Sequence, residues 1–261
     1  MNHEKIASMF SLDGKTALIA GASRGIGEEI ARVYGLAGAK LVISSRKPDG
    51  IQEAAIRLRE QTGAEILAVA ANISKPEDRK KLVDEAMAWA GRVDILVNNA
   101  GTNPANGPLA DVQESAWDKI FEVNLKGPFI LSRMIFHAWM KENGGCIINT
   151  TSIASYGTGG SLEGAYCITK SALTHLTRIL ASEWGKHRIR VNAIAPGVIK
   201  TRLSQALWDH PGMEHAGQNL AVPRLGEVED IAGAALLLAS KAGELINGQD
   251  IIIDNGTLVS R

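Results

Sequence analysis

This sequence has few cysteines, no excess of either charge and no long apolar run. Two cysteines, Cys146 and Cys167, are too few for a disulfide framework, so a reducing cytoplasm is the simplest expectation. The 28 Lys and Arg residues balance the 28 Asp and Glu residues, which gives no electrostatic basis for binding nucleic acid or an anionic membrane. The longest apolar runs, such as AALLLA at 234–239, are too short to span a bilayer. We therefore expect a cytoplasmic protein with no nucleic-acid partner and no membrane partner.

Clusters of metal-ligating residues are also missing from the sequence. His210 and His215 are five positions apart, which does not align them well on a helix. No cysteine or acidic cluster accompanies them. We therefore expect no metal site.

What the sequence does contain is a regular alternation of short apolar runs with longer helical patterns. The apolar runs are rich in Ile, Val and Leu with little polar alternation, as in strands buried on both faces. Their spacing suits repeated βαβ units without a long linker. We expect a single α/β domain over residues 1–261, a Rossmann-type three-layer doubly wound sandwich with a seven-stranded parallel sheet. The expected strands are 16–20, 40–44, 65–70, 94–98, 146–150, 190–195 and 250–254, and the expected helices are 25–37, 50–61, 76–90, 115–139, 165–184 and 228–240.

The motif GASRGIG, residues 21–27, follows the first expected strand and opens the first expected helix. Its spacing is G-x-x-x-G-x-G. Gly21 would allow the tight turn, Gly25 would let the backbone approach a pyrophosphate, and Gly27 would let the helix pack closely on the strand. The helix N-terminus adds free N–H groups for an anion. The motif therefore predicts a dinucleotide site, although a glycine-rich turn without a ligand would have the same composition.

The end of the second expected strand bears on which cofactor is bound. Folds that prefer NAD usually carry an acidic residue there, about 20 residues beyond the glycines, to bind the ribose hydroxyls. Here Ser45, Arg46 and Lys47 take its place, and Arg24 adds another cation. Because arginine and lysine suit a 2′-phosphate, we expect NADP(H) rather than NAD(H). Solvated loop charges are the alternative interpretation.

Tyr166 and Lys170 stand four positions apart in AYCITK, residues 165–170. Positions i and i+4 of a helix share a face, so the pair is either a surface contact or a device for proton transfer. A free phenol has a pKa of about 10, and a nearby ammonium group favours the phenolate. We therefore expect Lys170 to lower the pKa of Tyr166.

Together these motifs resemble the single-domain branch of the short-chain dehydrogenase/reductase family. The motifs that carry the resemblance, in order, are GASRGIG, NNAG at 98–101, Ser152, the Tyr166 and Lys170 pair, and Pro196-Gly197. The match runs from about residue 10 to residue 256. Four shorter stretches resemble its NADPH-dependent carbonyl and retinol reductases: SSRK, AGTNP at 100–104, APGVIKT at 195–201 and RLGEVED at 224–230.

The resemblance implies hydride transfer between NADP(H) and a small-molecule carbonyl or secondary alcohol substrate. Tyr166 would be the general acid for reduction and the general base for oxidation. Lys170 would tune it and bind the nicotinamide ribose. Ser152, at the C-terminal end of an expected strand, would hold the substrate oxygen, with Ser155 as the alternative.

Asn124 would complete the catalytic set by holding a water that links Lys170 to solvent, as the resemblance implies. Pro128 has no N–H, so the carbonyl of Asn124 loses its i+4 helical donor and can accept from water. A proline kink needed only for packing is the alternative.

The resemblance also implies the other cofactor contacts. Small residues after the fourth strand would let adenosine and ribose lie against the backbone, Asn72 would stand where relatives carry an acid that contacts adenine, and the segment from Pro196 would fix the nicotinamide carboxamide. The full expected set is Gly21, Ser23, Arg24, Gly25, Ile26, Gly27, Ser45, Arg46, Lys47, Asn72, Ile73, Asn99, Ala100, Gly101, Tyr166, Lys170, Pro196, Gly197, Ile199 and Thr201.

Three further expectations concern the surroundings of the site. Residues 203–222 interrupt the regular alternation and suggest a substrate lid, or else core or subunit contacts. The helices at 115–139 and 165–184 resemble those that join subunits in the family, which predicts a homotetramer. A cofactor-sensing regulatory protein, or a non-redox enzyme on the same scaffold, is the alternative function.

Overall fold

The computed structural model describes residues 3–105, 107–158, 163–209 and 221–259. These described ranges contain seven strands, and each begins and ends within one residue of its predicted bounds. The strands are β1 (Thr16–Ala20), β2 (Lys40–Ser45), β3 (Ile66–Ala70), β4 (Ile95–Asn98), β5 (Gly145–Thr150), β6 (Ile189–Pro196) and β7 (Asp250–Ile253).

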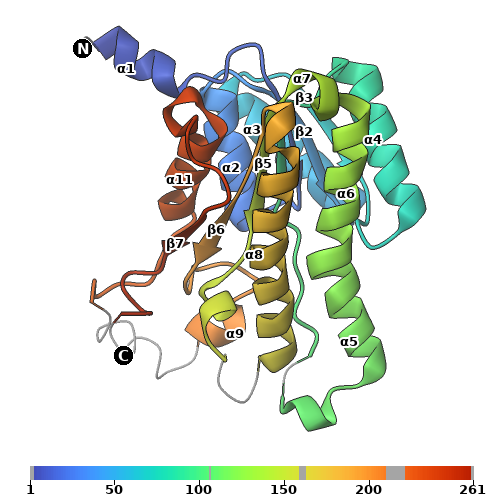
Figure 1. Cartoon of the computed structure of the whole chain (residues 1–261), viewed down its shortest axis with the longest axis vertical. Coiled ribbons are helices and arrows are strands. Elements are labelled where there is room, and N and C mark those ends of the chain that lie inside the picture. The colour runs from blue at the N-terminus through green and yellow to red at the C-terminus, as the bar shows by residue number, and fades with distance from the viewer. Residues whose placement is uncertain (1–2, 106, 159–162, 210–220, 260–261) are drawn as a thin grey trace.

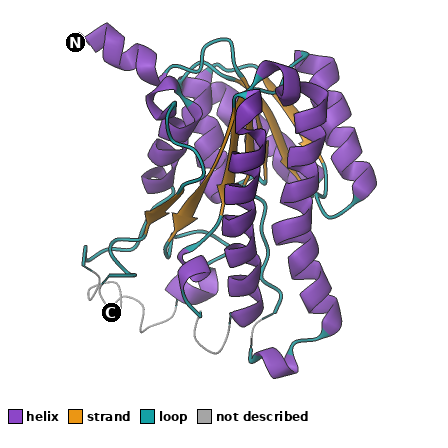
Figure 2. Ribbon diagram, in the orientation of Figure 1, coloured by secondary structure: helices purple, strands orange, loops and turns teal. Residues whose placement is uncertain are grey.

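All seven strands join one parallel sheet in the order β3-β2-β1-β4-β5-β6-β7. Helices cover both faces of this sheet (Figure 1 and Figure 2). The predicted Rossmann-type three-layer fold is therefore confirmed. The α-helices are α1 (His3–Phe10), α2 (Gly25–Leu36), α3 (Pro48–Thr62), α4 (Pro76–Ala90), α5 (Glu114–Phe121), α6 (Gly127–Ile135), α7 (Lys141–Asn143), α8 (Gly164–Trp184), α9 (Gln205–Trp208) and α11 (Glu229–Ala239).

Two cores lie between the sheet and its helices. Alternate strand residues point to opposite faces, so Ile19 of β1 packs with α2, α3 and α11, while Leu18 packs with α4, α6 and α8. Both residues are fully buried. The strand sequences are continuous apolar runs because a helical layer covers each face of the sheet. Within the described ranges, no helix combines the length and apolar character needed to cross a membrane.

The helical segment predicted at 115–139 departs from a simple α-helix. It runs from α5 through a π-helical turn, η2 (Glu122–Lys126), into α6, and then through a second such turn, η3 (Phe136–Met140), into α7. Pro128 lies at the second residue of α6, where its missing N–H would otherwise break the helical ladder. In η2, the N–H of Gly127 bonds the carbonyl of Glu122 instead, so the chain remains helical beyond the proline.

The strand order reverses between β1 and β4, because the chain first builds β2 and β3 on one side and then crosses to the other. Such a switch point leaves a crevice at the carboxyl ends of the strands, where open α/β sheets bind their ligands. Gly21 follows β1 there with a φ of 88°, and a Cβ on it would lie 2.7 Å from the backbone of Ala100. Only glycine fits this approach.

The remaining short elements in the described part of the chain are four 3-10 turns, of which one lies beside the crevice. They are η1 (Leu109–Asp111), η4 (Ile153–Tyr156), η5 (Gly185–His187) and η6 (Lys241–Gly243). Of these, η4 follows β5 and packs against α8.

Candidate active site

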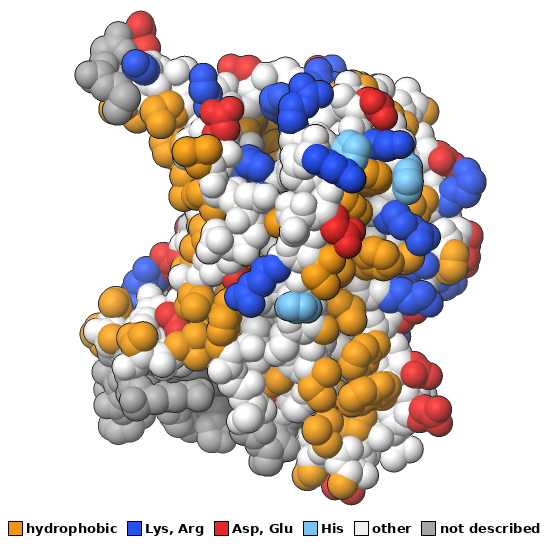
Figure 3. Space-filling view, in the orientation of Figure 1, with side chains coloured by type: hydrophobic (Ala, Val, Ile, Leu, Met, Phe, Trp, Pro, Cys, Tyr) orange, Lys and Arg blue, Asp and Glu red, His pale blue; other side chains and the backbone are white. Residues whose placement is uncertain are grey.

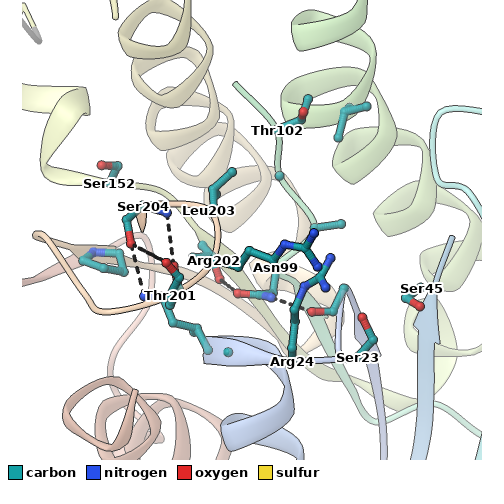
Figure 4. A pocket seen from close by; sticks show the side chains of 18 of the residues that line it. Ser23, Arg24, Ser45, Asn99, Thr102, Ser152, Thr201, Arg202, Leu203 and Ser204 are labelled. Atoms are coloured by element: carbon teal, nitrogen blue, oxygen red, sulfur yellow. Dashed lines mark hydrogen bonds between the residues drawn. The ribbon is translucent and has the colours of Figure 1, made fainter. Parts of the chain in front are cut away.

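A pocket of about 280 Å³ opens at the carboxyl ends of the strands. Figure 4 shows it from close by, with side chains reaching in from the glycine loop, the ends of β2 and β4, and the segment that follows β6. The predicted residues that line it are Gly21, Ser23, Arg24, Gly25, Ile26, Ser45, Arg46, Asn72, Ile73, Asn99, Ala100, Gly101, Ser152, Tyr166, Lys170, Pro196, Gly197, Ile199 and Thr201. Thus one cavity gathers residues that are far apart in the sequence.

Three predicted residues do not line the pocket: Gly27, Lys47 and Asn124. Gly27 packs behind the loop, where a Cβ would lie 2.2 Å from the carbonyl oxygen of Gly21. Lys47 is exposed at the N-terminus of α3. Gly27 therefore packs closely, as its place in the motif predicts, and direct contact of Gly27 or Lys47 with the cofactor stays a prediction.

The glycine loop is held against β4 by side-chain hydrogen bonds. The Asn99 Nδ2 donates to the carbonyl oxygen of Gly21 over 2.8 Å, and the Asn99 Oδ1 accepts from the Thr150 hydroxyl over 3.2 Å. Gly25, with a φ of 64°, begins α2, and a Cβ on it would lie 3.4 Å from Thr201. The loop, the switch point and the segment after β6 therefore form one continuous wall.

The charges in the pocket lining all have the same sign. Arg24, Arg46, Lys170 and Arg202 line it, and no Asp or Glu does so among the described residues. Cations with no carboxylate beside them favour an anionic ligand. Together with the glycine cradle at the start of α2, this donor set fits a nicotinamide dinucleotide, which brings phosphate groups.

Ser152 is the N-cap residue of η4, and Tyr166 lies in the first turn of α8, which packs against η4. Ser152 caps η4 by accepting a 3.1 Å hydrogen bond from the N–H of Ala154, which fixes its position beside the strand end. A hydrogen bond between Ser152 and the phenol of Tyr166 favours the ionised phenol. Ser155, the alternative to Ser152, lies outside the pocket lining, and its hydroxyl is buried. The geometry therefore favours Ser152.

The expected lowering of the pKa of Tyr166 is wrong for the protein without a cofactor. Burial raises that pKa above its usual value of 10.0, the bond to Ser152 lowers it in part, and the nearby charge of Glu163 raises it further. The Lys170 Nζ lies 5.5 Å from the centroid of the phenol ring. Desolvation of the phenolate thus outweighs the neighbouring ammonium group.

Lys170 is 3% exposed and donates a 2.7 Å hydrogen bond to the carbonyl oxygen of Thr150. Burial lowers the pKa of its ammonium group to about 8, and the charge of Asp250 opposes that shift. Asp250 is in turn held by the hydroxyls of Thr151, at 2.9 Å, and Thr174, at 2.8 Å. Lys170 is therefore a buried cation whose charge is sensitive to its surroundings near neutral pH.

Asn124 is fully buried in η2, and its side chain bonds protein groups. Its Oδ1 accepts from the N–H of Thr102 and its Nδ2 donates to the carbonyl of Thr102, both at 2.9 Å; Nδ2 also lies 3.2 Å from the hydroxyl of Thr169. A Cβ on Gly101 would lie 3.7 Å from both the Asn124 Oδ1 and the Lys170 Nζ. The side chain therefore fixes Thr102, a pocket residue, close to Lys170.

The pocket also contains residues that the sequence analysis did not assign to the cofactor. They are Ser44, Ala71, Thr102, Val123, Thr150, Thr151, Arg202, Leu203 and Ser204. Ser204 bonds the Thr201 hydroxyl at 2.9 Å, and the indole of Trp208 donates to the Thr201 carbonyl over 2.9 Å, so the start of the expected lid is tied to the pocket wall. Residues 210–220 of that expected lid lie outside the described residues.

Known proteins of similar sequence and structure extend these observations. The family model described as "Enoyl-(Acyl carrier protein) reductase" matches residues 21–257. "Dehydrogenase/reductase SDR family member 4" of Caenorhabditis elegans is 41% identical over 250 residues, which cover 94% of this chain and 95% of that protein.

Two solved structures superpose closely on this fold. A gluconate 5-dehydrogenase from Burkholderia cenocepacia J2315, in complex with NADP and tartrate, is 32% identical with a TM-score of 0.91 over 97% of this chain and 99% of that chain. A 7 alpha-hydroxysteroid dehydrogenase, complexed with NADH and 7-oxo glycochenodeoxycholic acid, is 34% identical with a TM-score of 0.91 over 98% of both chains. Proteins of this architecture thus include one solved with NADP and one solved with NADH.

Proposed function

Because this chain belongs to the short-chain dehydrogenase/reductase family of nicotinamide-dependent oxidoreductases, we propose that it transfers a hydride between NADP(H) and a carbonyl or secondary alcohol substrate. The observation that carries the proposal is the meeting of Ser152, Tyr166 and Lys170 in the same pocket as the glycine loop. A protein that only sensed the cofactor would not need this proton-transfer set.

The preference for NADP(H) is supported by the charges at the adenosine end of the pocket. Ser45 and Arg46 line it at the end of β2, where NAD-preferring folds carry a carboxylate, and Arg24 adds a cation from the glycine loop. Arginine can bind a phosphate through two parallel hydrogen bonds. We therefore assign the 2′-phosphate to Ser45 and Arg46.

The catalytic residues then divide the proton chemistry among them. The bound cofactor supplies or accepts the hydride. Tyr166 gives a proton to the substrate oxygen during reduction and takes it back during oxidation, while Ser152 holds that oxygen by a hydrogen bond. The ammonium group of Lys170 stabilises the phenolate that Tyr166 leaves when it gives up its proton. The proton is then restored from solvent through Lys170 and the polar groups around Thr102, which Asn124 holds in place.

The test is a substrate screen with both cofactors. Purified protein is mixed with NADPH or NADH and a panel of ketones and aldehydes, and the absorbance of the reduced nicotinamide is followed. We expect consumption of the reduced cofactor with at least one carbonyl and a higher kcat/KM with NADPH. Tight NADPH binding with no turnover of any carbonyl would favour a sensor, and higher efficiency with NADH would overturn the cofactor assignment.

We also propose a homotetramer, built through the helices around α5 and α8. Figure 3 shows hydrophobic side chains gathered over the region of these two helices. On α8, Ile168 is 40% exposed and Ile179 is 41% exposed. A contiguous apolar patch at a surface is typical of a protein–protein contact. Light scattering coupled to size-exclusion chromatography tests the assembly, and a monomer mass would overturn it.

A further inference from the structure

Arg202 is a pocket residue that the proposed function leaves without a role. It follows Thr201 in the segment after β6 and is exposed. Most arginines in the described part of the chain bond a carboxylate or a carbonyl, as Arg57 bonds Glu28 and Arg190 bonds Leu238. Arg202 makes no hydrogen bond or ion pair with any described residue. Its charge is therefore free to meet a ligand.

Arg24 is the residue that Arg202 faces. In Figure 4 the two side chains extend toward each other from opposite walls of the pocket, one from the glycine loop and one from the segment after β6. Arg24 also lacks a hydrogen bond or ion pair within the described ranges. Two guanidinium groups repel each other, and an anion placed between them removes that repulsion and can accept bonds from both.

The position of Arg202 indicates which anion this is. Its neighbour Thr201 approaches Gly25, where a Cβ would lie 3.4 Å from the threonine methyl group. Gly25 is the first residue of α2, a helix of 12 residues whose N-terminus faces the pocket. That end of a helix binds a pyrophosphate in dinucleotide folds. The 2′-phosphate, in contrast, is assigned to the side chains at the end of β2.

We propose that Arg202 binds the pyrophosphate of the nicotinamide dinucleotide, opposite Arg24 and across the start of α2. The inference rests on the proposed function, because it requires a dinucleotide in this pocket. If so, the segment that follows Thr201 contacts the cofactor as well as the substrate. Since NADPH and NADH share the pyrophosphate, Arg202 adds affinity for both and does not choose between them.

The experiment measures binding, independently of turnover. Dissociation constants for NADPH, NADH and adenosine 2′-phosphate are determined by calorimetry for the wild type and for Arg202→Met and Arg202→Lys. We expect Arg202→Met to raise the Kd of NADPH and of NADH by about tenfold each, as expected for loss of a hydrogen bond to a charged group. Arg202→Lys should recover part of this loss. Adenosine 2′-phosphate, which lacks the pyrophosphate, should bind as it does to the wild type.

A matched control removes one positive charge elsewhere. Lys241 is exposed in η6, which precedes β7 and so lies toward the amino ends of the strands, away from the pocket. Lys241→Met should leave all three dissociation constants unchanged.

The possible outcomes separate this inference from its competitors. Unchanged affinity of Arg202→Met for both dinucleotides would overturn it. A loss confined to NADPH and adenosine 2′-phosphate would assign Arg202 to the 2′-phosphate instead. Unchanged dinucleotide affinity with a raised KM for anionic ketones alone would assign it to the substrate. If wild-type protein bound neither dinucleotide, the proposed function itself would fail.

Discussion

The ammonium group of Lys170 donates a 2.7 Å hydrogen bond to the carbonyl oxygen of Thr150, the last residue of β5. This bond ties α8 to the strand end from which the chain continues to Ser152. The distances among Lys170, Tyr166 and Ser152 are therefore set by the packing of a helix on the central sheet. Rigid elements of this kind hold catalytic groups more precisely than loops do.

The phenol of Tyr166 is the group on which proton transfer depends. Tyr166→Phe removes the hydroxyl and keeps the ring, so the pocket retains its shape. We expect kcat to fall by about 10²–10⁴-fold, the usual contribution of general acid–base catalysis. The Kd of NADPH, measured by calorimetry, should change little. Wild-type turnover in this variant would contradict the proposed role of Tyr166.

The buried charge of Lys170 should make stability depend on pH. Because the folded-state pKa is about 8 and the usual value is 10.5, the native state releases its proton before the unfolded state does. Wild-type stability therefore gains from this group as the pH rises from 8 to 10.5. Lys170→Met has no such group. We expect the difference in unfolding free energy, wild type minus variant, to rise by roughly 3 kcal/mol across that window.

Urea denaturation of both proteins at several pH values measures this difference. Other groups that titrate in alkali are common to both chains and cancel in the subtraction. A difference that stays constant from pH 8 to pH 10.5 would mean that burial does not lower the pKa of Lys170 in the native state.

Glu163 offers a way to shift the pH dependence of catalysis without touching a proposed catalytic residue. Its charge raises the pKa of Tyr166. Glu163→Gln should therefore lower the pKa of Tyr166 and move the corresponding limb of the pH–rate profile of alcohol oxidation to lower pH. Glu244→Gln, at an exposed position, is the matched control and should leave the profile in place. A shift toward higher pH in Glu163→Gln would contradict this electrostatic account.

The fold was predictable because burial on both faces of a parallel sheet leaves a strong signal in the sequence. Val42 and Ile43 are both fully buried, one on each face, so the strand contains no polar alternation. The helix α1 (His3–Phe10) was not predicted, since it is largely exposed and lacks a buried apolar stripe. The interruption at η2 was also missed: Pro128 signalled a kink, but not that an i+5 hydrogen bond would keep the chain helical.

The candidate site was predictable where a motif fixes the backbone geometry. It was less predictable where the burial of a side chain determines its pKa. Gly21 and Gly25 lie in the crevice because their positive φ angles are needed there. The spacing of Tyr166 and Lys170 identified the pair, but the sequence does not reveal how deeply each is buried. Desolvation therefore reversed the expected pKa shift of Tyr166. Arg202 was missed because the expected motif ended at Thr201.

Asn124 is expected to contribute to stability as well as to activity. It is fully buried, and Asn124→Ala leaves both the N–H and the carbonyl of Thr102 without their partner. We expect a loss of about 2–4 kcal/mol in unfolding free energy, measured by urea denaturation. Turnover measured well below the melting temperature should fall and its pH profile should change. Unchanged turnover across the pH range would count against a role for this side chain, although the backbone carbonyl of residue 124 would survive the substitution.

Two glycines allow the packing argument for the first loop to be tested with a matched pair. A Cβ on Gly27 would lie 2.2 Å from the carbonyl oxygen of Gly21 and 2.5 Å from the Asn99 Nδ2, whereas a Cβ on Gly50, within α3, would meet nothing within 4 Å. Gly27→Ala must push the glycine loop away from β4, so it should destabilise the protein by about 1–3 kcal/mol and weaken NADPH binding. Gly50→Ala should stabilise it by about 0.5–1 kcal/mol through the helix propensity of alanine, with NADPH affinity unchanged. Melting curves and calorimetric titrations of both variants measure these effects. Equal stability and equal affinity in the two variants would show that close packing at Gly27 does not hold the loop.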